Sequence, residues 1–220
     1  MADERSARSS GNRPVPSDPL HGPVDADERL RRWLDSVLAT PGLTSIRDHA
    51  EARRALLDDS LRGVELVRRF EGPVVDVGSG GGAPGIPLAA AFPGREVVLL
   101  EARRRKCDFL ARATGEFPNV RVVWGRAEEQ QVDVFGVAVA KALAPPPVAA
   151  EWCLPLVRPG GAAILWVGPS VDVDAVTWVA DRLAAGRPEN HDGLLVLPKL
   201  GATPAGFPRR PGAARKHPLA

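Results

Sequence analysis

The fold is decided by the stretch Val74-Val75-Asp76-Val77-Gly78-Ser79-Gly80-Gly81-Gly82-Ala83-Pro84-Gly85. Its first four residues have the apolar, β-branched character of a short buried strand, and the residues that follow continue as a helix. Because glycine has no Cβ atom, a glycine-rich segment can turn tightly and let a ligand approach the main chain. Free N–H groups where the helix begins then face that ligand. The stretch therefore predicts a ligand-binding loop between a strand and a helix of an α/β domain.

The glycine spacing by itself fits two kinds of ligand. Gly78, Gly80 and Ala83 match the relaxed dinucleotide fingerprint, in which a pyrophosphate lies against the loop. Asp76 favours S-adenosylmethionine, because its carboxylate can reach the cationic methionyl end of that cofactor and would repel a pyrophosphate. We therefore predict that Asp76, Gly78, Gly80, Gly82 and Ala83 bind S-adenosylmethionine. A nicotinamide-dependent oxidoreductase and a glycine-rich turn without a ligand are the alternatives.

Short apolar runs alternate with helical stretches from Pro73 onward. The strand candidates are residues 74–77, 97–100, 120–124, 137–140, 162–167 and 194–197. The helix candidates are residues 86–91, 104–116, 148–157 and 173–184. Such alternation implies right-handed crossovers and a mostly parallel sheet covered on both faces. We expect the Rossmann-like α/β fold of a class I S-adenosylmethionine-dependent methyltransferase.

The chain divides into three predicted parts. Residues 1–24 are rich in Pro, Ser, Gly, Arg and Asp and lack periodicity, so we expect a disordered arm. Residues 25–70 have helical periodicity, first around Trp33 and then from about Asp48 to Phe70, and predict an N-terminal helical extension. Residues 71–220 form the methyltransferase domain and end in a basic tail.

Composition limits the remaining possibilities. No apolar run approaches the roughly 20 residues of a membrane helix, and the N-terminus lacks an apolar signal region. Cys107 and Cys153 are far apart and lack CxxC spacing, which argues against a disulfide framework and a zinc site. We predict a cytoplasmic protein without a metal or a membrane partner. Residues 199–216 hold five Lys/Arg residues and no acid, which suits a phosphate-rich partner; a solvated tail is the alternative.

Two further segments predict cofactor contacts. Glu101 ends the second strand, where a carboxylate can accept both ribose hydroxyls. Ala127 and Glu128 follow the third strand, where the backbone and a side chain can read the adenine amino group. Without a ligand, Glu101 would be a solvent-facing strand end, and Glu128 an acid favoured at a helix N-terminus.

Several motifs together resemble a known family. They lie at residues 43–48, 59–61, 76–87, 126–129, 199–204 and 207–212, and include the signature Pro84-Gly85-Ile86-Pro87. On these residues the sequence resembles the bacterial 16S rRNA guanine-N7 methyltransferase G family, also called glucose-inhibited division protein B, over roughly residues 42–219.

The resemblance implies a reaction and a partner. The family uses S-adenosylmethionine to methylate N7 of a guanine (position 527) in the 530 loop of 16S rRNA, as naked rRNA or within the small ribosomal subunit. Gly78 and Ala83 would line the cofactor, Glu101 would bind the ribose, and Ala127 and Glu128 the adenine. Guanine N7 carries a lone pair and no proton, so the main task of the protein is alignment.

Lys141 is the one candidate for substrate positioning, and it is also a candidate cofactor contact. It stands where the family usually has an arginine after its fourth strand. The chain also departs from the family pattern at Gly42, at Ala55-Leu56 and at Val167, where the family usually has Asn, Arg-His and Lys. A catalytically impaired relative that binds cofactor or RNA is therefore an alternative, as is a small-molecule methyltransferase.

Phosphate contacts are predicted from basic residues near the third strand and in the tail. The candidates, besides Lys141, are Arg126, Arg209, Arg210 and Lys216.

Overall fold

The computed structural model of the chain describes residues 27–220, so the predicted disordered arm, residues 1–24, lies outside the described residues. The N-terminal elements are α1 (Glu28–Ala39), α2 (His49–Ala52), the π-helical turn η2 (Arg53–Asp58), α3 (Asp59–Leu61) and α4 (Val64–Arg68). Then follow β1 (Val74–Val77), α5 (Gly85–Ala91), β2 (Val97–Glu101), α6 (Arg104–Ala113), β3 (Val120–Trp124), the 3-10 turn η3 (Ala127–Glu129) and β4 (Phe135–Lys141). The last elements are α7 (Pro146–Cys153), η4 (Leu154–Leu156), β5 (Val157–Trp166), α8 (Val173–Arg182), β6 (Glu189–His191), β7 (Leu194–Pro198) and α9 (Ala213–Lys216).

One mostly parallel sheet organises these elements, as the sequence predicted. Its seven strands have the order β3-β2-β1-β4-β5-β7-β6. β1 to β5 run parallel, whereas β7 pairs antiparallel with both β5 and β6. The central strands β1 and β2 are buried at every position, which explains why they read as continuous apolar runs rather than alternating ones.

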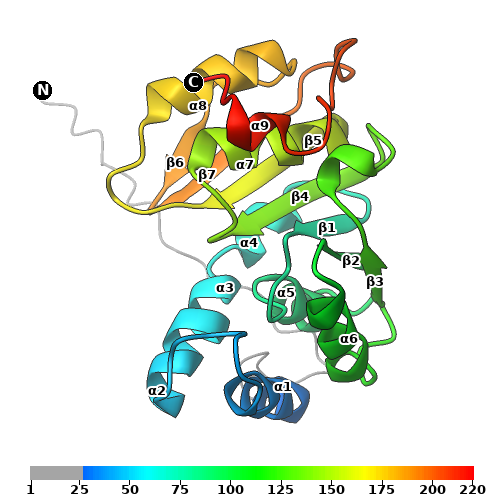
Figure 1. Cartoon of the computed structure of the whole chain (residues 1–220), viewed down its shortest axis with the longest axis vertical. Coiled ribbons are helices and arrows are strands. Elements are labelled where there is room, and N and C mark those ends of the chain that lie inside the picture. Colours follow the sequence, from blue (N-terminus) through cyan, green and yellow to red (C-terminus); the bar gives the residue numbers. More distant parts are fainter. Residues whose placement is uncertain (1–26) are drawn as a thin grey trace, which may run out of the picture.

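Helices cover both faces of the sheet (Figure 1), with α1, α5 and α6 on one side and α7, α8 and α9 on the other. Successive strand side chains point to opposite faces. Val97 and Leu99 of β2 therefore pack with Ile86 of α5 on the first side, and Val98 and Leu100 join the core on the second side.

The N-terminal residues of the described chain are helical and join the first of these two cores. Asp27 begins α1 by accepting the backbone N–H of Arg29 at 2.9 Å, and Trp33 lies on the buried side of the helix. The stretch predicted from about Asp48 to Phe70 consists of α2, η2, α3 and α4. Because the extension shares its core with the sheet, the division between residues 25–70 and 71–220 remains a prediction.

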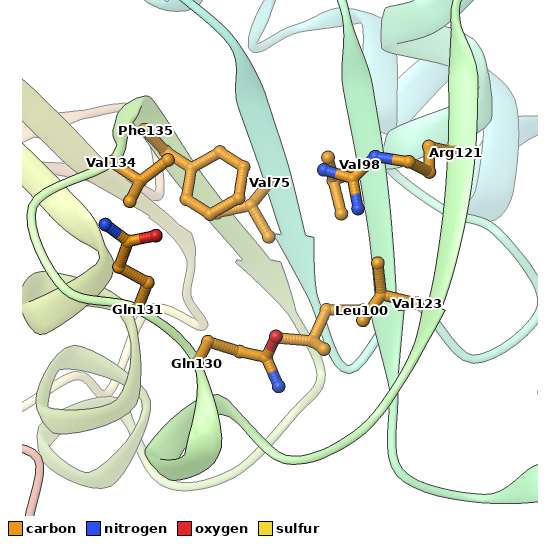
Figure 2. Close-up of a pocket in the computed structure, with 9 residues that line it drawn as sticks. All are labelled: Val75, Val98, Leu100, Arg121, Val123, Gln130, Gln131, Val134 and Phe135. Atoms are coloured by element: carbon orange, nitrogen blue, oxygen red, sulfur yellow. The ribbon is translucent and has the colours of Figure 1, made fainter.

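Between β3 and β4 the described chain has only the short turn η3 instead of a crossover helix. A pocket of about 150 Å³ opens there, against the face of β2 and β3 that such a helix would cover. In Figure 2, Val98, Leu100 and Val123 lie on these strands, and Gln130 and Gln131 lie on the loop after η3. The lining is mostly apolar, and its one charged side chain, Arg121, is paired with Glu96. This pocket therefore offers no chemistry of its own.

Candidate cofactor site

The glycine loop, residues 78–83, follows β1, and α5 begins two residues after it at Gly85. Neither the first residue of the loop nor Gly85 has room for a side chain. Gly78 has φ +73°, and a Cβ atom there would lie 2.3 Å from Leu143 Cδ1. A Cβ atom on Gly85 would lie 2.3 Å from Leu99 Cδ2 and 2.7 Å from Asp76 Oδ2. Gly78 and Gly85 therefore have no room for a side chain, whereas a Cβ atom on Gly80 or Gly81 would make only ordinary contacts, at 3.5 Å or more.

A second pocket, of about 190 Å³, opens directly against this loop. Its lining combines the glycine loop with the ends of β4 and α6 and with the N-terminal extension. The residues are Trp33, Val37, Leu43, Leu56, Gly78, Ser79, Gly80, Gly81, Ala83, Lys106, Lys141 and Ala142. The structure thus brings Gly78, Gly80, Ala83 and Lys141 together around one cavity. Gly82, Asp76, Glu101, Ala127 and Glu128 lie outside its lining.

Asp76 is buried at the end of β1, with 1% of its surface exposed. Its Oδ2 atom accepts the N–H of Gly85 at 3.0 Å. Its Oδ1 atom is buried and has no hydrogen-bond partner among residues 27–220. Burial raises the pKa of Asp76 to about 7, although the Gly85 hydrogen bond acts in the opposite direction. Burying a carboxylate oxygen without a partner costs free energy. The Oδ1 side of Asp76 therefore fits a cationic group.

Glu101 holds the loop from the end of β2. Its Oε2 atom accepts the N–H of Gly80 at 3.0 Å, and its Oε1 atom accepts the N–H of Arg103 at 2.8 Å. A carboxylate has about four lone-pair sites, so each oxygen can still accept a hydroxyl. Glu101 therefore fixes the position of Gly80 and keeps its forked acceptor geometry beside the loop.

Lys141 links the end of β4 to the N-terminal extension. Its ammonium lies 2.5 Å from Asp59 Oδ2 and donates to the carbonyl of Ala55. Burial raises the pKa of Asp59, but hydrogen bonds from Lys141 and Arg62 outweigh burial and hold that pKa below its ordinary value. Lys141 thus bonds to the backbone of Ala55, one of the two positions at which the family usually has Arg-His.

Trp33 and Lys106 are among the eight lining residues that were not predicted from the sequence as site residues. Trp33 donates its Nε1–H to the carbonyl of Gly81 at 2.8 Å and so fastens α1 to the glycine loop. Lys106 Nζ lies 3.7 Å from the place that a Cβ atom on Gly80 would occupy. Helical periodicity predicted only that Trp33 would be buried. The run of basic residues that ends at Lys106 was the one available signal for that lysine.

The loop after β3 meets the C-terminal tail. Ala127 is buried, and Glu128 Oε1 accepts the N–H of Gly212 at 2.9 Å. The Glu128 carboxylate therefore holds the tail, and its contact with adenine remains a prediction. Arg126 is exposed, and its backbone N–H donates to Glu129 Oε2 at 3.2 Å.

The basic tail offers fewer free cations than its sequence indicated. Lys199 belongs to the interior: it is 1% exposed and donates to the Leu183 carbonyl at 2.9 Å. Burial lowers its pKa. Arg209 makes two 2.6 Å hydrogen bonds to Glu151, a pairing that raises the pKa of the arginine. Arg210 and Lys216 are exposed, as a phosphate contact requires.

S-adenosylmethionine fits the residues of this site. The glycine loop admits a ligand to the main chain, and the unpaired Oδ1 atom of Asp76 matches an ammonium group. Together with the strand order and the glycine loop after β1, the site defines a class I S-adenosylmethionine-dependent methyltransferase. A sequence model of the family described as rRNA small subunit methyltransferase G matches residues 28–177. The chain belongs to that family, and the predictions of an rRNA methyltransferase and of its cofactor are confirmed.

Relatives with this description cover most of the chain. Ribosomal RNA small subunit methyltransferase G of Synechococcus elongatus is 34% identical over 220 aligned residues, covering 90% of this chain and 86% of the relative. The protein of the same name from Pelotomaculum thermopropionicum is 34% identical over 197 residues, covering 80% and 82%.

Solved structures share the fold at low sequence identity. An S-adenosylmethionine-dependent O-methyltransferase of Thermotoga maritima has a TM-score of 0.54 and 18% identity, covering 74% of this chain and 73% of that chain. A mutant of MtNAS solved in complex with S-adenosylmethionine has a TM-score of 0.54 and 16% identity, covering 78% and 72%. These likenesses confirm the fold alone.

Proposed function

We propose that this protein methylates N7 of a guanine in the 530 loop of 16S rRNA, at position 527 in the family pattern. Family membership supports an rRNA substrate. The observation that carries the chemistry is the buried Asp76 Oδ1 atom, which lies beside the glycine loop and lacks a partner among the described residues. A cationic cofactor would supply that partner, whereas a dinucleotide pyrophosphate would be repelled.

The proposal gives each cofactor residue a role. Asp76 binds the methionyl ammonium, and the backbone from Gly78 to Ala83, including Gly80 and Gly82, lies against the cofactor. Glu101 accepts the ribose hydroxyls, and Ala127 and Glu128 border the adenine. When bound, the sulfonium group supplies an already activated methyl group.

No residue is needed to remove a proton, because guanine N7 carries a free lone pair. The pocket instead holds the guanine and keeps the reacting atoms in line, an effect that can supply up to about 7–11 kcal/mol. We assign the positioning of the base to Lys141, whose ammonium lines the pocket while Asp59 and the Ala55 carbonyl fix its direction. Leu56 forms part of the apolar wall of the same pocket.

The proposed partner is 16S rRNA or the small ribosomal subunit in the cytoplasm. Arg126, Arg210 and Lys216 are exposed and suit phosphate contacts. Arg209 is a weaker candidate, because its guanidinium is already bonded to Glu151. Within residues 27–220, none of the helices has the length and apolar character needed to cross a bilayer.

A catalytically impaired relative is the second candidate, and Ala55-Leu56 and Val167 are the observations that favour it. The test is incubation of the protein with labelled S-adenosylmethionine and either 16S rRNA or 30S particles, followed by mapping of the modified base. Label on one guanine N7 supports the proposal. Binding of S-adenosylhomocysteine without any transfer to RNA supports the impaired relative, and binding of NADH in place of S-adenosylhomocysteine overturns both.

A further inference from the structure

The beginning of α6 carries an unbalanced run of positive charge. Arg103, Arg104, Arg105 and Lys106 are consecutive, and the first turn of the helix contains no acid. The N-terminal end of a helix already has positive partial charge, so cations there are unfavourable. Arg104 pairs with Asp108 at 3.2 Å, whereas the other three form no ion pair with any described carboxylate. A bound polyanion would relieve this repulsion.

An exposed aromatic ring stands beside these cations. Trp124, the last residue of β3, is 59% exposed, although a tryptophan this open to water is unusual. Its Nε1–H donates to the Ala102 carbonyl at 3.1 Å, and the Arg104 guanidinium lies 4.8 Å from the ring centroid. These two contacts hold the ring in place while leaving much of it accessible. A fixed exposed ring among cations is the combination on which single-stranded nucleic acids stack their bases.

These residues border the cofactor pocket. Lys106, in the same turn of α6, lines that pocket. Arg105 donates to the carbonyl of Pro41 at 3.3 Å, two residues before Leu43, which also lines it. The backbone N–H of Arg103 bonds to Glu101. An RNA strand lying on this surface would therefore have its neighbouring base at the mouth of the pocket.

We propose that Arg103, Arg104, Arg105 and Trp124, here called the α6 basic surface, bind the single-stranded rRNA that flanks the target base. The arginines contact backbone phosphates, and Trp124 stacks on a nucleobase. The proposal rests on the proposed function and names a contact surface in addition to the C-terminal tail.

The phosphate contacts are tested with the double variant Arg103→Gln, Arg105→Gln. Loss of two contacts to single-stranded RNA reduces the slope of log affinity against log salt by about 1.4. We expect affinity for a 16S rRNA fragment to fall at least about fivefold at about 0.15 M salt. The matched control is Arg182→Gln, Arg187→Gln, which removes the same charge from the end of α8 and from the segment before β6, at the opposite edge of the sheet.

The stacking contact is tested with Trp124→Leu, for which we expect a loss of RNA affinity of about fivefold or more with an unchanged salt slope. The control is Trp178→Leu. Trp178 is also exposed, at 49%, and also lies against an arginine, with Arg182 3.7 Å from its ring centroid. Circular dichroism and calorimetry with S-adenosylhomocysteine check that every variant is folded and binds cofactor.

The outcomes separate the two proposals. If the unmodified protein methylates rRNA while both test variants bind RNA as tightly as their controls, the α6 basic surface is wrong and the proposed function stands. If the unmodified protein binds no rRNA, both are wrong. A selective loss in the test variants supports the surface.

Discussion

Among single residues, Asp76 couples the cofactor site to pH. Burial raises its pKa to about 7, against about 3.9 in an unfolded chain. A raised pKa favours the protonated form in the folded state, so this contribution to stability is complete below about pH 4. This contribution to the free energy of unfolding is lost as the pH rises from about 4 to about 7. The loss amounts to at most about 4 kcal/mol. A cation bound at Oδ1 favours the ionised form and therefore opposes this loss.

We therefore expect affinity for S-adenosylhomocysteine to increase between about pH 5.5 and 7.5, below the range where the amino group of the ligand itself titrates. Asp76→Asn should bind about 10- to 100-fold more weakly at pH 7.5, because a hydrogen bond to a charged group is lost. Its binding should change less with pH. Calorimetry across this range measures both effects, with the exposed Asp181→Asn as control. An affinity profile of Asp76→Asn that follows the unmodified protein would contradict the assignment.

The sequence predicted a set of cofactor contacts but not how these residues are bonded to the rest of the protein. Asp76, Glu101 and the glycines were predicted because glycine loops and strand-end acids have a fixed spacing in this fold. The ion pair of Lys141 with Asp59 joins residues 82 positions apart, by subtraction of their numbers. The bonds of Trp33 to Gly81 and of Glu128 to Gly212 span 48 and 84 positions. Such contacts depend on tertiary packing, which local patterns do not encode.

Among the structural elements, the start of α5 directly after the glycine loop leaves no room for an added methyl group. Gly85→Ala would place a methyl group 2.3 Å from Leu99 Cδ2 and 2.7 Å from Asp76 Oδ2. Both neighbours are buried, so we expect a loss of about 1–3 kcal/mol of unfolding free energy from overpacking. Cofactor affinity should fall with it, since Gly85 donates to Asp76. Gly94→Ala is the control, because nothing lies within 4 Å of its Cβ position. Equal urea denaturation midpoints for the two variants would contradict this reading.

The neighbouring residues Arg209 and Arg210 of the C-terminal tail differ in their surroundings. Glu151 is 3% exposed in its side chain and accepts both hydrogen bonds from Arg209. Arg209→Met would leave that carboxylate buried and unpaired, at a cost of about 3 kcal/mol. Arg210→Gln should leave the thermal midpoint unchanged and weaken RNA binding with a smaller salt slope. Thermal unfolding and RNA titration of the two single variants separate these roles. If the Arg209→Met protein is as stable as the unmodified protein but binds RNA more weakly, Arg209 contacts RNA and does not anchor the tail.

The sequence predicted the apolar strands better than the polar or very short elements. The buried strand β1 and the edge strand β3, which has no buried residue, both have their predicted bounds, because each is a β-branched apolar run bounded by turn residues. The edge strand β6 was missed, since Glu189-Asn190-His191 has no apolar character and is held only by pairing with β7. The helix predicted at residues 148–157 ends at Cys153, and η4 and then β5 follow from Leu154 and Val157. The four-residue α9 is too short for periodicity to reveal.

For the whole molecule, the N-terminal extension and the sheet act as one unit. Trp33 and Val37 of α1 belong to the same core as β1 and β2, and both also line the candidate cofactor pocket. A ligand in this pocket therefore contacts both parts of the chain. Its binding energy adds to the stability of the folded molecule, since a ligand that binds only the folded state stabilises it by mass action.

S-adenosylhomocysteine at about 100 times its dissociation constant should add about 2.7 kcal/mol and raise the thermal midpoint by about 5–10 °C. Trp33→Phe keeps an aromatic ring but removes the hydrogen bond to Gly81, so we expect about fivefold weaker binding and a smaller shift at the same ligand concentration. Trp152→Phe is the matched control, because the buried Trp152 Nε1–H has no partner within the described chain. If Trp33→Phe and Trp152→Phe bind the ligand equally well, α1 contributes to the core of the molecule but does not position the glycine loop.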